Sequence, residues 1–382
     1  MNTQGIKPPG QAGSGAGAKK PLRRFLPLFL ALTACDNWNL PVKDSIAVLN
    51  AMTPVSSWEE LKSAVDTIAG PQLIGLTKSF PAAGGGTITV SRPLTITAAP
   101  GVTAVITRPT GFTGSFFEVG THLGSGDLTL GRPGGGTLVL DGGAVSGSSS
   151  LIAISYGSCT MQDGAELRNN HDGGGVHVAT GYSFTMNGGT ISGNTATGNG
   201  GGVYVDGAFT MNGGTISGNT AASGGGGVYV AGPTGAFTMN GGTISGNTSA
   251  SASGGGGGVY VAGLTGYSFT MNGGAISGNT AAFNGGGVYV NGGAFTMKGG
   301  AISGNTAAFN GGGVYVNGPT VVFKKYGGVI YGMNGGAMNN LVTNNSGTPC
   351  GHAVYVTPSK RRESTAGERD DLDSTGGGGW DS

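Results

Sequence analysis

Residues 209–230 read FTMNGGTISGNTAASGGGGVYV, and this phrase recurs along the middle of the chain. The shortest spacing between copies is 25 residues (184 to 209) and the longest is 32 (237 to 269). Such a period is typical of stacked supersecondary units, none of which buries its apolar face alone. The conformation of one unit therefore decides the fold. The copies begin at Phe184, Phe209, Phe237, Phe269 and Phe295, with degenerate copies at Cys159 and Phe323.

Each unit contains three short runs in which apolar and polar residues alternate, at 209–211, 215–217 and 228–230 in the copy quoted above. Alternation with a period of two predicts strands with one buried face. The runs are too short and too rich in glycine for helices. We therefore predict one coil of a parallel β-helix per repeat. The inward residues would be Phe209, Met211, Ile216, Val228 and Val230, and the outward ones Thr210, Thr215, Ser217 and Tyr229.

Asparagine recurs at one offset after the second run. In a parallel β-helix, equivalent residues of successive coils stack about 4.8 Å apart. Their side-chain amides can then hydrogen-bond from coil to coil. A disordered glycine-rich linker would not need Phe, Met, Ile and Val at fixed offsets. We therefore predict an asparagine ladder formed by Asn194, Asn219, Asn247, Asn279 and Asn305.

The repeats also carry two short signatures. FTMN stands at 184–187 and GGGV at 200–203, and both recur in the later copies. In these signatures the chain resembles the repeats of chlamydial polymorphic outer membrane proteins, which are of the FxxN and GGAI type. More broadly, residues 130–356 look like a bacterial right-handed parallel β-helix surface protein. The resemblance implies an all-β, single-stranded right-handed parallel β-helix, and it says little about activity.

A basic segment, 19–24, precedes the apolar stretch 25–34. The stretch is too short to span a bilayer and is typical of an export signal. It leads into LTAC at 32–35, which resembles the lipobox of bacterial lipoproteins. That resemblance implies a lipid on Cys35 and a membrane anchor. We therefore expect an exported protein of the cell envelope, at the outer membrane or the cell surface.

The segment between the signal and the repeats has its own pattern. Residues 57–60, Ser-Trp-Glu-Glu, form a capping box before an apolar stripe of Trp58, Leu61, Val65 and Ile68. We expect a helix that covers the open end of the solenoid. Early strands are expected at 87–90, 94–97, 105–107, 116–119, 128–130 and 138–140. The predicted organisation is an export signal with a disordered N-terminal extension (1–35), a tether (36–54), a capping helix (55–70), irregular early coils (71–136), regular repeats (137–356) and a disordered tail (357–382).

Charge is scarce in the repeats, because Asp206 and Lys298 are the formal charges between residues 173 and 322. Polysaccharide lyases and glycosidases need clustered carboxylates. The coil at Cys159 is richer in charge, and it supplies weak catalytic candidates next to His177. A solvated surface of a less regular coil is the simpler interpretation. The candidates are Asp141, Asp163, Glu166, Arg168, His171 and Asp172; when the repeats are aligned, Leu167 takes the position of Ile191, Arg168 points outward and Glu166 falls at a one-residue insertion.

An outward column of tyrosines is the candidate ligand-binding surface, because exposed aromatic rings suit contacts with sugars or proteins. Stacking for cohesion alone is the other interpretation. His177 and Tyr355 continue the column at its two ends. Its members are Tyr204, Tyr229, Tyr260, Tyr289 and Tyr315.

Composition narrows the function further. The net charge of +1 gives no reason to expect a nucleic-acid partner. Three cysteines exclude a disulfide scaffold, and Cys159 falls at the buried Phe position. No metal or cofactor motif is present in the sequence. We expect a non-catalytic, lipid-anchored surface protein, an adhesin or a ligand-binding or structural protein, whose partners are glycans or proteins of a host or neighbouring cell. Two alternatives stay open: a secreted polysaccharide-active enzyme using the Asp141–His177 region, and an antigenically variable repeat protein without a defined ligand.

Overall fold

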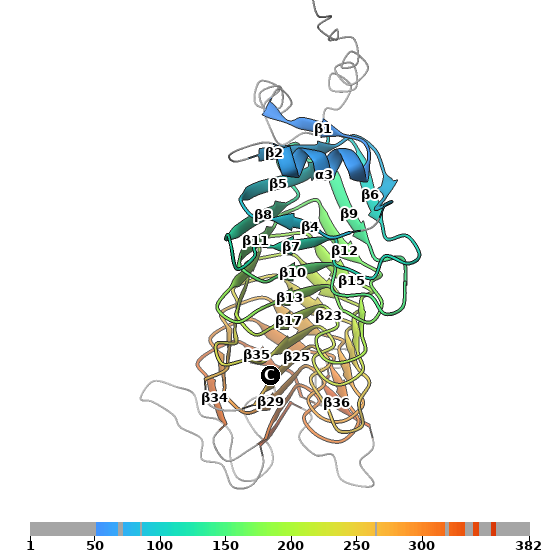
Figure 1. Cartoon of the computed structure of the whole chain (residues 1–382). Helices are drawn as coiled ribbons and strands as arrows, with labels where there is room; N and C mark the ends of the chain where they lie inside the picture. The colour runs from blue at the N-terminus through green and yellow to red at the C-terminus, as the bar shows by residue number, and fades with distance from the viewer. Residues whose placement is uncertain are drawn as a thin grey trace, which may run out of the picture. The chain divides into compact units, whose positions relative to one another are not determined.

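The computed structural model describes residues 51–67, 72–84, 86–263, 266–317, 321–332, 339–343 and 353–356. These residues form a right-handed parallel β-helix in which the chain passes repeatedly through the same sheets (Figure 1). The predicted fold is therefore confirmed. The expected export signal with Cys35, most of the expected tether and the expected tail lie outside the described residues.

Sheet 1 holds the first run of each repeat, and its neighbouring strands are parallel. Because the same residues recur at the same offsets, Phe209 pairs with Phe237 and Met211 with Met239. In spatial order the strands are β1 (Thr53–Val55), β2 (Gln72–Leu76), β5 (Pro93–Ala98), β8 (Gly126–Leu130), β11 (Gly157–Met161), β14 (Ser183–Met186), β18 (Ala208–Met211), β22 (Ala236–Met239), β26 (Ser268–Met271), β30 (Ala294–Met297) and β34 (Val322–Lys325).

Sheet 2 holds the second run, again with parallel neighbours in register. Its outer face in the regular coils carries a column of Thr or Ala and a column of Ser. The strands are β3 (Phe80–Pro81), β6 (Thr103–Thr107), β9 (Thr137–Asp141), β12 (Ala165–Arg168), β15 (Thr190–Ser192), β19 (Thr215–Ser217), β23 (Thr243–Ser245), β27 (Ala275–Ser277), β31 (Ala301–Ser303) and β35 (Val329–Ile330).

Sheet 3 holds the third run, so that Tyr204, Tyr229 and Tyr260 stand at one position of successive strands. The strands are β4 (Ile88–Val90), β7 (Phe117–Val119), β10 (Ile152–Ile154), β13 (Val176–Val178), β17 (Val203–Val205), β21 (Val228–Val230), β25 (Val259–Ala262), β29 (Val288–Asn291), β33 (Val314–Val316) and β37 (Val354–Val356).

The structure contains a fourth sheet, whereas the sequence predicted only three strands per repeat. The two residues after the ladder asparagine form a fourth, very short strand in each coil from residue 195 onward. A two-residue run carries no recognisable alternation, and it pairs because the coils above and below are almost identical. The strands are β16 (Thr195–Ala196), β20 (Thr220–Ala221), β24 (Thr248–Ser249), β28 (Thr280–Ala281), β32 (Thr306–Ala307) and β36 (Leu341–Val342).

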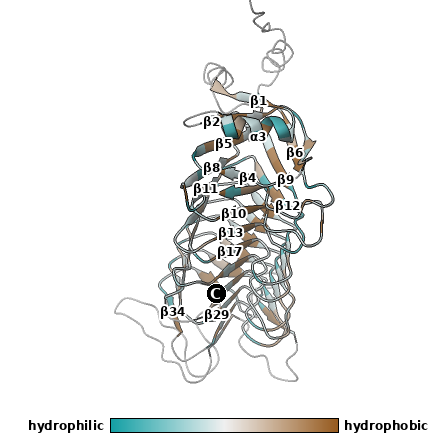
Figure 2. Cartoon of the chain, viewed as in Figure 1, coloured by the Kyte–Doolittle hydropathy of each residue, from teal (hydrophilic) through white to brown (hydrophobic). Residues whose placement is uncertain are grey.

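The core is a set of stacked columns inside the coils. Figure 2 shows apolar residues concentrated on strands such as β9 and β13. The phenylalanines stack almost parallel, with ring centroids 4.7 Å apart between Phe209 and Phe237 and between Phe269 and Phe295. Cys159 pairs with Phe184 and is 1% exposed, as its position in the repeat predicts. Each added coil therefore buries the apolar face of the coil before it.

The helix α3 (Trp58–Thr67) packs against the first coils, at the blue end of the solenoid in Figure 1. Trp58, Leu61 and Val65 are buried, and the Trp58 ring lies 6.0 Å from that of Phe116. The Glu60 amide donates to Ser57 Oγ at 3.1 Å, as a capping box requires. The Glu60 carboxylate accepts from the amide of residue 56 at 2.7 Å, one residue earlier than in the standard motif.

The N-terminal coils begin earlier than the sequence indicates. All six early segments that we expected are strands, β4 to β9, with slightly different bounds. In addition, β1 pairs with β2 and starts at Thr53, inside the segment expected to be a tether. β2 lies directly after the expected helix segment. The sequence analysis did not predict either strand; β1 is defined by its register with β2, and β2 by its register with β5.

Candidate functional site

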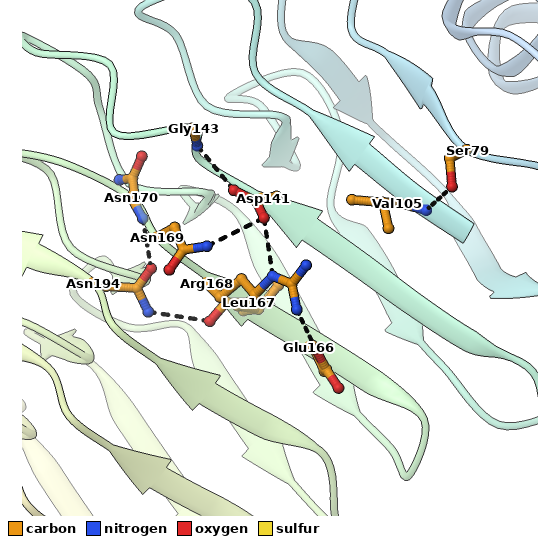
Figure 3. A network of polar contacts seen from close by, with 10 residues as sticks. All are labelled: Ser79, Val105, Asp141, Gly143, Glu166, Leu167, Arg168, Asn169, Asn170 and Asn194. Atoms are coloured by element: carbon orange, nitrogen blue, oxygen red, sulfur yellow. Dashed lines mark hydrogen bonds and ion pairs between the residues drawn. The ribbon is translucent and has the colours of Figure 1, made fainter. Parts of the chain in front are cut away.

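Three of the charged candidates, Asp141, Glu166 and Arg168, lie on two neighbouring strands of sheet 2 (Figure 3). Asp141 ends β9 and Arg168 ends β12, so the two stand opposite each other. Arg168 Nε lies 2.9 Å from Asp141 Oδ2, and Arg168 Nη1 lies 3.3 Å from Glu166 Oε2. The amide of Gly143 and the side-chain amide of Asn169 also donate to Asp141, at 3.0 and 3.2 Å. One guanidinium therefore bridges both carboxylates.

Glu166 does not sit at an insertion, contrary to the sequence alignment. It pairs with Thr190, while Leu167 pairs with Ile191 and Arg168 with Ser192, as expected for the last two. The extra residue is Ala165, which pairs with Leu138 of the preceding coil and is buried. A small side chain can enter the core here, and this keeps Glu166 in the outward column.

The remaining charged candidates form separate contacts. Asp163 lies 3.9 Å from Arg132, and both side chains are largely exposed. His171 Nδ1 lies 2.7 Å from Asp172 Oδ1, and the other oxygen of Asp172 accepts from the amide of residue 147. The six candidates therefore form three separate groups: Asp141, Glu166 and Arg168 in one, Asp163 with Arg132 in another, and His171 with Asp172 in the third. Among the described residues, no three His, Cys, Asp or Glu side chains are grouped so as to hold a metal ion.

The asparagine ladder is confirmed, and it extends one coil further in each direction, to residues 170 and 340. Asn219 is typical of its members: it is 0% exposed, and its Nδ2 donates to Asn247 Oδ1 and to the carbonyl of Ile191, each at 3.0 Å. Asn247 Oδ1 also accepts from the backbone amide of Asn219. The ladder therefore satisfies buried backbone groups at the turn between sheets 2 and 4.

A second asparagine column, which the sequence analysis missed, lies on the surface directly after sheet 1. The Nδ2 atoms of Asn212, Asn240 and Asn272 each donate to the Oδ1 of the asparagine in the preceding coil, at 2.7 to 2.8 Å. The signal was present in the sequence, because an asparagine follows the methionine of the first run in four successive repeats. The members are Asn187, Asn212, Asn240 and Asn272, all exposed.

The tyrosine column is continuous, with neighbouring ring centroids 4.8 to 5.5 Å apart from Tyr204 to Tyr355. It is not the uniformly exposed strip that the sequence suggested, since Tyr289 is 3% and Tyr315 is 7% exposed. Glycine-rich spacers run against the rings: a Cβ at Gly255 would lie 2.4 Å from the Tyr289 ring. Burial raises the pKa of Tyr289 to about 12, although a hydrogen bond from Asn317 opposes this shift.

The tyrosine column is more exposed at the end formed by Tyr204 and Tyr229. Asp206, the carboxylate within the regular repeats, lies at this end. Tyr204 and Tyr229 are half-buried, and the His177 ring meets the Tyr204 ring edge to face, with centroids 5.2 Å apart. His177 Nε2 lies 3.5 Å from Asp206 Oδ2. Burial and then the nearby Asp206 raise the pKa of Tyr204. This end joins aromatic faces with a hydrogen-bond acceptor, a combination that suits a polar ligand with a flat face.

Arg108 is a second residue that the sequence analysis missed. It is 4% exposed, and its guanidinium donates to the carbonyls of Phe112, Gly114 and Ser149. The guanidinium carbon also lies 5.0 Å from the centre of the Phe116 ring. Burial lowers the pKa of Arg108 to about 10. These contacts hold the loop between β6 and β7 against the first coils, which is a structural role.

Comparison with protein-family models, with curated proteins and with solved structures finds no significant match to this chain. Within the described residues, no helix has the length and apolarity needed to cross a membrane. The fold and the geometry of its outer columns therefore carry the functional argument.

Proposed function

We propose that the chain is a non-catalytic protein of the bacterial cell envelope that displays its β-helix as a binding surface. The observation that carries this proposal is the chemistry of the outer columns. Over residues 173–322 they present Thr, Ser, Asn and Tyr, with Asp206 and Lys298 as the formal charges. Such a surface recognises partners by hydrogen bonding and aromatic contact, which suits glycans and neutral protein surfaces.

Binding is favoured over polysaccharide cleavage by the contacts of Arg168. A glycosidase uses one carboxyl group as an acid and a second as a base or nucleophile, on either side of the scissile bond. Here Arg168 bridges Asp141 and Glu166. One oxygen of each carboxylate is therefore occupied by the same guanidinium and is not offered to a substrate. Cleavage of any member of a polysaccharide panel by the protein would overturn this part of the proposal.

The binding surface that we propose is the more open end of the tyrosine column. The test is an array of glycans and matrix proteins probed with the parent protein and with a Tyr204→Ala, Tyr229→Ala variant. We expect the double variant to lose at least about tenfold in affinity, because each ring supplies aromatic contact area at the site. The matched control is Thr238→Ala, an outward residue of sheet 1 in a neighbouring coil, which should bind like the parent. An array with no bound partner would refute the proposal.

We propose that a lipid on Cys35 anchors the protein, at the outer membrane or the cell surface. Support comes from the basic segment, the apolar stretch and LTAC at 32–35. Labelled palmitate should enter the parent protein in cells and should not enter a Cys35→Ser variant. Equal labelling of the two proteins, or none in the parent, would refute the anchor without affecting the binding proposal.

A further inference from the structure

Four Asn-Gly pairs of the surface column are nearly identical in local sequence. TMNGGTISG surrounds Asn187, Asn212 and Asn240, and TMNGGAISG surrounds Asn272. An asparagine followed by glycine can lose its side-chain amide, because the unhindered glycine nitrogen attacks the side-chain carbonyl carbon. In an unfolded chain these four sites should react alike. Any difference between them in the folded protein must come from tertiary contacts.

The column has a direction, and Asn187 stands at the end where an amide is left without an acceptor. Asn212 and Asn240 both donate through Nδ2 and accept through Oδ1, and Asn272 donates. Asn187 Oδ1 accepts from Asn212 at 2.8 Å, while its Nδ2 makes no hydrogen bond to the described residues. The oxygen on which negative charge would develop is thus held by a donor. The nitrogen that must leave is not restrained.

A carboxylate lies beside the glycine of this pair, on the side where a Cβ would point, while the Gly188 amide donates to the Met161 carbonyl. A Cβ at Gly188 would lie 2.0 Å from Asp163 Oδ1. The equivalent positions at Gly213 and Gly241 meet a backbone carbonyl at 2.6 Å instead. The amide of Gly188 also makes the longest of the equivalent hydrogen bonds to the preceding coil, 3.4 Å compared with 3.2 Å for Gly213. The ion pair of Asp163 with Arg132 is long and exposed, so it leaves this carboxylate available.

We propose that Asn187–Gly188 is a site of self-modification, at which Asp163 assists deamidation. The Gly188 nitrogen forms a bond to Cγ of Asn187, and Asp163 accepts the proton that this nitrogen loses. The bond from Cγ to the side-chain nitrogen breaks, and the nitrogen leaves as ammonia with that proton. Water then opens the five-membered imide to give aspartate or isoaspartate at position 187. Overall, one water is consumed and one ammonia is released.

The test follows the four sites during incubation of the folded, full-length protein at neutral pH. Chymotrypsin suits the peptide map, because no Lys or Arg lies between 169 and 297, whereas Phe and Tyr separate the four asparagines. We expect deamidation at Asn187 to be several-fold faster than at Asn212 and Asn240. In concentrated urea the rates should become equal. Equal rates in the folded protein, or a slower rate at Asn187, would overturn the proposal.

Asp163→Ala separates the role of the carboxylate from the position at the end of the column, and it creates no new Asn-Gly pair before Gly164. In this variant the rate at Asn187 should fall several-fold, toward that of Asn212, which serves as the internal reference in the same molecule. Circular dichroism verifies that the variant is folded. Asp206→Ala, which removes a carboxylate directly after β17 of sheet 3, should leave the rate at Asn187 unchanged. An unchanged rate at Asn187 in Asp163→Ala would contradict the role of Asp163.

Discussion

At the scale of single residues, one side-chain type serves two purposes in this molecule. Asn247 is fully buried and hydrogen-bonds two backbone groups of the preceding coil. Asn240, in the same repeat, is exposed and bonds mainly to other asparagine side chains. The two columns differ in their access to solvent, because a buried amide that loses its partner cannot form a replacement hydrogen bond with water. The buried column is therefore structural, whereas the exposed column is free to react.

Asn247→Ala tests this difference. The change leaves the Asn219 amide and the Ile216 carbonyl without their buried partners. We expect the free energy of unfolding, measured in urea, to fall by at least about 2 kcal/mol. The control is Asn240→Ala, which should cost less than about 0.5 kcal/mol because solvent can replace its bonds. Equal losses in the two variants would contradict a structural role for the buried column.

Cys159 provides a second prediction at this scale. Burial, with a smaller effect of Asp127, raises the pKa of its thiol. The reactive thiolate is therefore scarce at neutral pH. A thiol reagent should fail to label Cys159 in the folded protein and should label it in urea, as read by peptide mass. Rapid labelling of the folded protein would mean that the Phe column opens at this coil.

At the scale of elements, the strands keep register while the spacers absorb the variation in repeat length. The spacer between β24 and β25 covers residues 250–258, and the equivalent one between β20 and β21 covers 222–227. The strands on both sides still pair residue by residue. Long spacers cost little, because loop-closure entropy rises slowly with length.

Deletion of Ala252–Gly254 should therefore be tolerated. The shortened spacer reads ASGGGGV, the same as residues 222–228. We expect the midpoint of urea unfolding to change only slightly. Deletion of Ile244 alone is the contrasting variant: it moves every later residue of β23 to the opposite face and should destroy cooperative unfolding. A large loss in the spacer variant would show that the spacer itself stabilises the coil.

The tyrosine column predicts a loss of stability at high pH. In the unfolded chain tyrosine ionises near pH 10, whereas burial raises the pKa of Tyr289 to about 12. Between these values the unfolded state binds fewer protons, so the free energy of unfolding falls as pH rises. Urea unfolding at several pH values measures the slope. Tyr289→Phe should reduce the slope without abolishing it, because burial also raises the pKa of Tyr260 and Tyr315.

At the scale of the whole β-helix, stability is a sum over coils and the contacts between adjacent coils. Removal of residues 209–236 joins Ala208 to Phe237 and removes one complete coil. The remaining coils keep their register, and Asn194 meets Asn247. We expect a folded β-helix with a moderately lower unfolding midpoint, by circular dichroism and urea titration. Removal of 209–222 alone breaks the order of the sheets and should abolish folding; tolerance of both deletions would contradict a defined register.

The candidate sites were less predictable than the fold. Sequence alignment placed Arg168 outward, and the structure agrees. It did not show that Arg168 bridges Asp141 and Glu166, since that depends on side-chain directions across coils. Nor did it show that the Asp163 carboxylate lies beside Gly188 of the next coil. Such contacts join residues about one coil apart, and alternation along one strand carries no information about them.

By itself, the sequence determined the coil, its inward residues and the buried asparagine ladder. Alternation with a period of two is local, and stacking only repeats it. The tertiary structure alone decided which tyrosines are covered, which asparagine lies at the end of the surface column, and the pairing of the charged side chains. The physical reason is that burial and hydrogen bonding at these positions depend on the paths of the spacers and on the neighbouring coil.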